Sequence, residues 1–130
     1  MDVRRINYLF IFSFSECQTK ASLTAIGASS VYQNNEALWG PKLALTELSK
    51  TSTGYWHSAA GDTKPWIKLG MDGLKKVDEV TVVDRLDGAN HRFKNVEVSV
   101  GTSEKYVSCG TQSYQTGHNL TYKYVVSSVE

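Results

Sequence analysis

The sequence predicts an all-β fold, an antiparallel β-sandwich of the jelly-roll kind, and three alternating segments support this prediction. In residues 79–83, 96–100 and 120–126, apolar side chains recur at every second position, which is typical of half-buried strands. Turn signals rich in glycine, aspartate and asparagine separate these segments. Short strands joined by glycine-marked turns at this spacing indicate a sandwich of two sheets.

Length and charge limit the domain organisation and the classes of partner. A chain of 130 residues supports one domain, and its hydrophobic share of 41% is that of an ordinary globular protein. A net charge of +1 argues against a nucleic-acid partner, because such partners are held by neutralising many phosphates.

Residues 1–15 have the features of a secretory signal peptide. Arg4 and Arg5 provide the positively charged N-terminal region of such a peptide, and residues 6–14 are mostly apolar. Ser13 and Ser15 are small residues at the expected cleavage site. The apolar run of about ten residues is too short to span a bilayer, which needs roughly twenty. We therefore expect a secreted, extracellular protein whose single domain covers residues 16–130. The alternative is that the segment is a buried first strand.

One segment competes with the all-β interpretation. Pro41 suits the first position of a helix, and good helix formers follow it as far as Lys50. A short helix is therefore the alternative to a strand or loop here.

The two cysteines leave two arrangements open. In a secreted protein, Cys17 and Cys109 can form a disulfide, which stabilises by roughly 4 kcal/mol when it closes so long a loop. The alternative is that Cys109 is unpaired or pairs outside the chain. Asn119 begins an Asn-Leu-Thr sequon, which predicts glycosylation on a surface loop.

The best candidate site is a pair of arginines after a valine-rich strand. Arg85 and Arg92 are separated by seven positions, with Asp87 between them, and His57 lies earlier in the chain. Guanidinium groups are planar forks of donors that suit hydroxyl or carboxylate oxygens, and Asp87 can orient one of them. The alternative is a turn salt bridge between Arg85 and Asp87.

Catalytic and metal motifs are missing from the sequence. It has no Gly-x-Ser-x-Gly, no phosphate-cradling glycine loop and no recognisable pair of catalytic carboxylates. His57, His91 and His118 lack zinc-ligand spacing with either cysteine. We expect a non-enzymatic protein with no metal site and no cofactor.

Several segments together resemble a known superfamily. They occur in order over about residues 25–110 and are residues 28–32, 55–58, 64–69, 80–85 and 92–101. This pattern resembles the F-type (fucose-binding) lectins and the coagulation-factor type C (discoidin) domains, which are galactose-binding-like β-sandwiches.

The lectin resemblance implies a carbohydrate-binding module for fucosylated glycans. His57, Arg85 and Arg92 match the hydrogen-bond donors to the sugar, with Asp87 in support. Tyr55 and Trp56 are candidates for stacking against the sugar. Weak single-site binding would be strengthened by multivalent display in an oligomer.

The sequence departs from the lectin pattern at three places. Gly88 and Ala89 stand where the lectins carry adjacent cysteines that pack against the sugar. Thr46 and Glu47 replace an Asp-Gly of the calcium loop, and the acidic ligand expected near the chain end would fall beyond Glu130, so calcium fits poorly. The family's closing strands would also follow residue 126, which predicts a domain truncated at its C-terminus.

The discoidin resemblance implies a second function, adhesion to protein or phospholipid. Leu38 and Trp39 lie in a region that the family uses as a loop, where exposed apolar side chains can enter a membrane. In this alternative Trp56 is a core residue and His57 is only its neighbour. Packing in the core is also the expectation for Trp66, because aromatic side chains bury large areas.

Overall fold

The computed structural model describes ten stretches of the chain. They are residues 2–4, 8–13, 15–16, 19–20, 22–45, 55–71, 77–84, 93–102, 105–115 and 121–126, the first four as backbone.

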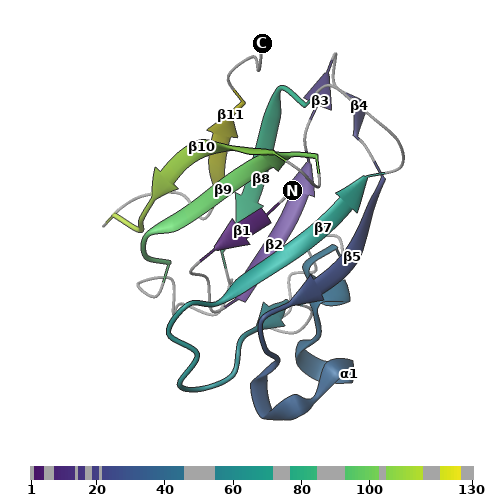
Figure 1. Cartoon of the computed structure of the whole chain (residues 1–130), viewed down its shortest axis with the longest axis vertical. Coiled ribbons are helices and arrows are strands. Elements are labelled where there is room, and N and C mark those ends of the chain that lie inside the picture. The colour runs from purple at the N-terminus through teal and green to yellow at the C-terminus, as the bar shows by residue number, and fades with distance from the viewer. Residues whose placement is uncertain are drawn as a thin grey trace.

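Two antiparallel sheets make the main body (Figure 1). The five-stranded sheet has the order β10 (Tyr106–Gln112), β9 (Val96–Gly101), β1 (Asp2–Arg4), β7 (Trp66–Met71) and β5 (Leu23–Ala28). The four-stranded sheet has the order β11 (Thr121–Val125), β8 (Glu79–Val83), β2 (Tyr8–Ser13) and β6 (Trp56–His57). A separate pair joins β3 (Ser15–Glu16) to β4 (Thr19–Lys20). The predicted all-β antiparallel sandwich is confirmed.

The alternating apolar positions of each strand fill the space between the two sheets. The largest fully buried side chains are Trp56, Ile67, Leu69, Val80, Val82, Phe93, Tyr122 and Tyr124. Val96 and Val98 join the same core cluster, whereas Glu97 between them is only half-buried. The two-residue period of the sequence therefore identifies the inner faces of β8, β9 and β11.

Two tyrosines of β11 connect the sheets. The ring of Tyr122 stacks on Phe93, just before β9, with 3.9 Å between centroids and 9° between planes. The Tyr124 hydroxyl donates to the Val96 carbonyl oxygen at 2.8 Å. Burial and then the neighbouring Tyr122 raise the pKa of Tyr124, so its hydroxyl stays a donor at all ordinary pH values.

Three short helical segments follow β5 at one end of the sandwich. They are η1 (Tyr32–Asn34), α1 (Glu36–Trp39) and η2 (Pro41–Leu45), where η denotes a 3-10 helix. The Asn35 side chain accepts a hydrogen bond from the Leu38 N–H at 3.1 Å and so caps the start of α1. The helix predicted over Pro41–Lys50 is thus a 3-10 helix in its first half, and residues 46–50 lie outside the described ranges.

The N-terminal strands lie inside the two sheets. β1 pairs with both β7 and β9, and β2 pairs with both β6 and β8. This is the arrangement of the alternative to a cleaved signal, and cleavage near Ser15 stays a prediction. No helix within the described part of the chain is long and apolar enough to cross a membrane.

Removing residues 1–15 should destabilise the domain. Loss of β1 and β2 removes the only partner strand of β6 and one of the two partner strands of β7, β8 and β9, and each lost hydrogen bond costs about 1 kcal/mol net. We expect the melting temperature of a 16–130 chain to fall by about 10 °C or more in calorimetry. An unchanged melting temperature would mean that the segment is a removable leader.

Candidate functional site

Four aromatic side chains gather at the end of the sandwich that carries α1. This aromatic cluster consists of Tyr32, Trp39, Tyr55 and His57. The His57 ring centroid is 4.6 Å from that of Tyr32 and 5.7 Å from that of Trp39. Trp39 also lies 5.4 Å from Tyr55. A helical segment, a loop and a strand therefore contribute to one group of rings.

The aromatic cluster is partly open to solvent. Tyr55 is only 3% exposed, so the prediction that its ring stacks against the sugar is wrong, whereas Tyr32, Trp39 and His57 are half-buried. Leu38, next to Trp39 on α1, is 57% exposed. Leu38 and Trp39 were predicted to be exposed on a loop; they lie instead on the short helix α1, where Leu38 is exposed and the Trp39 ring is only partly accessible.

Strand alternation separates Trp56 from His57. Trp56 is fully buried, and its Nε1–H donates to the Ser30 carbonyl oxygen at 3.0 Å. His57 points to the opposite side, and its Nδ1 lies 2.6 Å from the Ser58 carbonyl oxygen, so that nitrogen carries the donated proton. Trp56 is thus a core residue with no face left for a sugar, and only His57 reaches the site.

Trp66, in contrast to Trp56, is more exposed than the sequence predicts. It was expected in the core, but it is 38% exposed because it begins β7 on the outer side, while the next residue, Ile67, is fully buried. The period of the strand places one of the two adjacent large side chains outside.

The carboxylate of Asp62 joins the two chain segments that carry the aromatic cluster. Its Oδ2 accepts hydrogen bonds from the Ser29 and Ser30 hydroxyls at 2.7 and 2.6 Å. Its Oδ1 accepts from the Lys64 N–H at 3.1 Å. We call these three residues, Ser29, Ser30 and Asp62, the polar clamp.

Two backbone N–H groups also bond to the serines of the polar clamp. The Ser30 Oγ accepts from the Ala59 N–H at 2.9 Å, and the Ser29 Oγ accepts from the Trp66 N–H at 2.9 Å. Tyr32 follows Ser30 by two residues, and Ala59 follows His57 by two residues. The clamp therefore sets how the η1–α1 segment lies against β6.

Hydrogen bonding governs the ionisation of Asp62. Burial alone would raise its pKa, but the bonds from Ser30, Ser29 and the Lys64 N–H together lower it below the ordinary value of 3.8. The ionised form is therefore the one that holds the clamp.

The predicted sugar donors Arg85 and Arg92 and their partner Asp87 lie outside the described residues, so the structure gives no contact for them. The residues on either side, Asp84 and Phe93, are both buried. Burial and then the charge of Asp84 raise the pKa of Tyr122 to about 12.

The register of the four-stranded sheet relates His57 to the end of β8. His57 pairs with position 8 of β2, and Val83 pairs with position 10, so His57 and Val83 lie on the same face of the sheet, where Val83 is buried. β2 alone separates β6 from β8, which puts about 10 Å between their backbones. Arg85 follows Val83 by two residues in the sequence.

Cys109 is a free thiol in the structure, which is the alternative to the disulfide with Cys17. Burial against the core raises its pKa, although a backbone hydrogen bond opposes the shift, so the thiol stays protonated and unreactive. Cys17 and the Asn119 sequon lie outside the described residues.

Metal ligands do not come together within the described residues. No group of three or more His, Cys, Asp or Glu side chains there could hold a metal ion. The lone carboxylate of the polar clamp is already occupied by two hydroxyls and a backbone N–H.

Sequence reasoning missed Tyr32 and the polar clamp. Ser29, Ser30 and Tyr32 lie in one of the segments that carried the family resemblance. Nothing in their order shows that Tyr32 faces His57 or that the serines bond to Asp62. Asp62 follows Gly61, whose φ of +87° marks a turn. A Gly-Asp turn signal after a strand could have indicated the carboxylate, though not its partners.

The fold and the site define a binding module, a β-sandwich that presents aromatic and polar side chains on loops at one end. The chain belongs to the F5/8 type C domain family, whose model matches residues 25–129. Domains of this family bind carbohydrate or phospholipid and are generally not catalytic. Comparison with curated proteins and with solved structures finds no match.

Neutralising Asp62 should remove an acid-sensitive part of the stability. Because its pKa is lowered on folding, the contribution is present above about pH 3.8 and is lost as the pH falls through the lower folded value. We expect the melting temperature of the wild type to fall more steeply than that of Asp62→Asn between pH 5 and pH 3. The other carboxyl groups titrate in both proteins, so parallel curves would contradict the role of the clamp.

Proposed function

We propose that the chain is a carbohydrate-binding module whose sugar site is the aromatic cluster around His57. The observation that carries this proposal is the half-buried group of rings formed by Tyr32, Trp39 and His57, held by the polar clamp. Ring faces suit the C–H groups of a sugar, and an imidazole beside them can hydrogen-bond its hydroxyls.

Fucose is the sugar that the sequence motif favours. The support is the match of His57, Arg85, Arg92 and Asp87 to the F-type lectin pattern, together with the register that relates β6 to β8. Arginine donors to a neutral acceptor contribute about 1.5 to 3 kcal/mol each. The rings of Tyr32 and Trp39 would take the place of the apolar floor that Gly88 and Ala89 do not supply.

Substitutions in this site should weaken sugar binding. In calorimetric titration with a fucosylated trisaccharide, we expect His57→Ala, Arg85→Ala and Arg92→Ala each to lower the affinity about tenfold or more. Lys123→Ala, which changes an exposed side chain on β11, is the control and should bind like the wild type. Unchanged affinity in both arginine variants would rule out the lectin mechanism.

Phospholipid is the second candidate ligand, and one specific observation favours it. Leu38 is 57% exposed on α1, beside the half-buried Trp39 and near the exposed Lys42 of η2. An apolar side chain that enters a bilayer from such a tip gains about 1.5 to 3 kcal/mol on full burial. A neighbouring lysine suits an anionic lipid surface.

A flotation assay with phosphatidylserine-containing vesicles separates the two candidates. If lipid is the ligand, Leu38→Ala should reduce the bound fraction about fivefold, whereas Val125→Ala, an exposed aliphatic residue on β11, should not. Competition by free fucose, or binding unaffected by Leu38→Ala, would favour the sugar.

An extracellular location and multivalent display complete the proposal. The Asn119 sequon supports export from the cell. Several copies acting together would compensate for the weak affinity of one small site.

A further inference from the structure

A second group of ligand-compatible side chains lies on the outer face of the five-stranded sheet. We call it the outer strip, and it consists of Thr24, Ile26 and Gly27 of β5 and Trp66 and Lys68 of β7. Gly27 pairs with Lys68, and Thr24 pairs with Gly70, so these positions share one face. The opposite face of β7 is given by Ile67 and Leu69, which are fully buried. None of these residues belongs to the aromatic cluster.

The floor of the outer strip is bare backbone. A Cβ added at Gly27 would have no atom within 4 Å, so the space above this residue is open. The register of β5 against β7 shifts between Ala25 and Gly27, and this irregularity turns Ile26 outward, where it is 61% exposed and lies over Gly70. Glycine within a strand often marks a place where a ligand approaches the backbone.

Trp66 forms the wall on one side of this floor, and its backbone is held firmly. Its N–H donates to the Ser29 Oγ and its carbonyl oxygen accepts from the Ser29 N–H, both at 2.9 Å. The indole is nevertheless 38% exposed. The ring is therefore held in place and open to solvent at the same time. A ligand that stacks on it loses little free energy to the ordering of the side chain.

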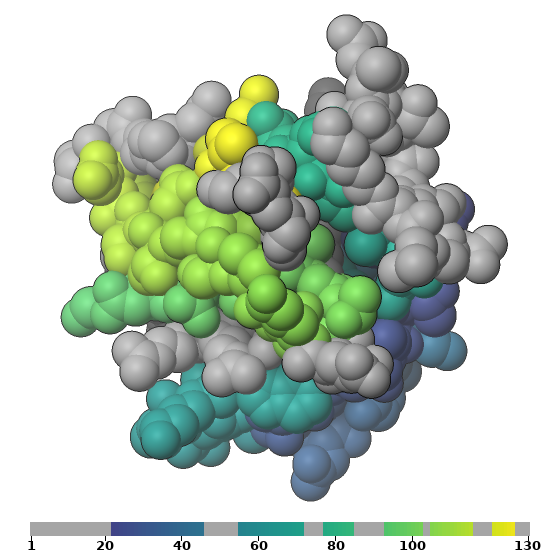
Figure 2. All heavy atoms as spheres, turned by 45° about the horizontal axis from the view of Figure 1, so that its top comes forward, coloured from purple at the N-terminus to yellow at the C-terminus, as the bar shows by residue number. Residues whose placement is uncertain are grey.

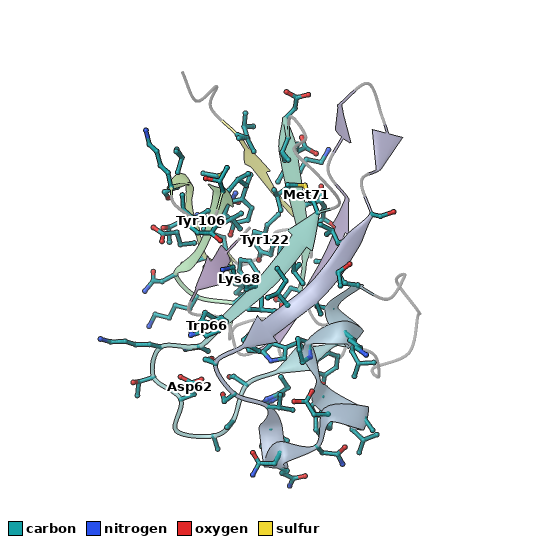
Figure 3. The ribbon with its side chains drawn as sticks, turned by 45° about the vertical axis from the view of Figure 1, so that its right-hand side comes forward. Asp62, Trp66, Lys68, Met71, Tyr106 and Tyr122 are labelled. Carbon is teal, nitrogen blue, oxygen red and sulfur yellow. The ribbon has the colours of Figure 1, made fainter. Side chains whose placement is uncertain are left out.

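Lys68 pairs with Gly27, and its side chain extends away from β5 across the sheet. Its Nζ lies 5.7 Å from the centroid of the Tyr106 ring on β10, although β1 and β9 lie between the two strands. Ser99, which is in register between them, is only 9% exposed despite its outward position. Figure 3 shows Trp66 and Lys68 following one another along β7, with Tyr106 beyond them. In the space-filling view, the teal of β7 lies below the green of β9 and β10 (Figure 2).

Among the described side chains of this face, the positive charge of Lys68 on β7 is offset by the negative charge of Glu97 on β9. A strongly charged partner therefore gains no net attraction here, and an apolar partner would bury charges at a cost. A neutral ligand with one C–H face and many hydroxyls suits both the rings and the polar edges.

We propose that the outer strip is a second carbohydrate site, one that takes a neutral saccharide lying flat over Gly27 beside Trp66. The indole stacks on the sugar ring, Ile26 contacts its apolar edge, and Thr24 hydrogen-bonds its hydroxyls. The site is independent of His57 and of the arginine motif.

The variant that tests this proposal most directly is Gly27→Val, because its side chain occupies the open space above the backbone of Gly27. Gly27→Val adds side-chain bulk where the structure has open space, and valine suits a strand, so the fold should be retained. Trp66→Ala removes the stacking face. Val125→Ala, at a position that is 69% exposed on the other sheet, is the control. Unchanged melting temperatures of all three variants confirm that any effect on binding is local.

The test uses a His57→Ala background so that the first site does not contribute. Cellotriose, maltotriose, chitotriose and a fucosylated trisaccharide are titrated and followed by tryptophan fluorescence and by amide chemical shifts. We expect at least one sugar to bind, to shift the amides of residues 24–27 and 66–68, and to lose affinity tenfold or more with Gly27→Val and with Trp66→Ala. No binding by any of the four sugars, or binding that both variants leave unchanged, would overturn the proposal.

Discussion

The two-residue period of the β-strand is the constraint on which this domain depends. It sends Trp56 into the core and leaves His57 on the rim, and it sends Ile67 inward and leaves Trp66 outside. Two adjacent large side chains of one strand thus differ in burial, because one faces the core and the other faces away from it. The same period makes the inner face apolar enough to hold two sheets together, because a one-residue shift of any strand would exchange its buried and exposed sets.

The polar clamp fixes the positions of the loops relative to the strands. A β-sandwich fixes its strands through the core, but the segments that join them need separate support. One carboxylate, Asp62, receives two serine hydroxyls and a backbone N–H, and Ser29 in turn holds the backbone of Trp66. The aromatic cluster on the α1 end and the outer strip on β5 and β7 are therefore connected through the same pair of serines, although they face different directions.

Much of the fold could be predicted from local pattern, and much of the candidate site could not. Alternation in residues 79–83, 96–100 and 120–126 identified strands that the structure contains, because a half-buried strand shows its period within a few residues. His57, Leu38 and Trp39 were identified by resemblance and lie together at one end. Tyr32 and Asp62 were missed, since their importance comes from partners that are about 25 to 33 positions away.

The sequence by itself determined the all-β class, the family and the inward positions of the strands, because these depend on residue type and short-range spacing. Only the tertiary structure decided which aromatic residues are presented to a ligand. Trp56 and Trp66 are alike in sequence terms, and their opposite burial follows from which face of each sheet meets the other sheet. The open floor at Gly27 is likewise invisible in the chain, because it depends on β5 being paired with β7 and on the side chains that neighbouring strands place around it.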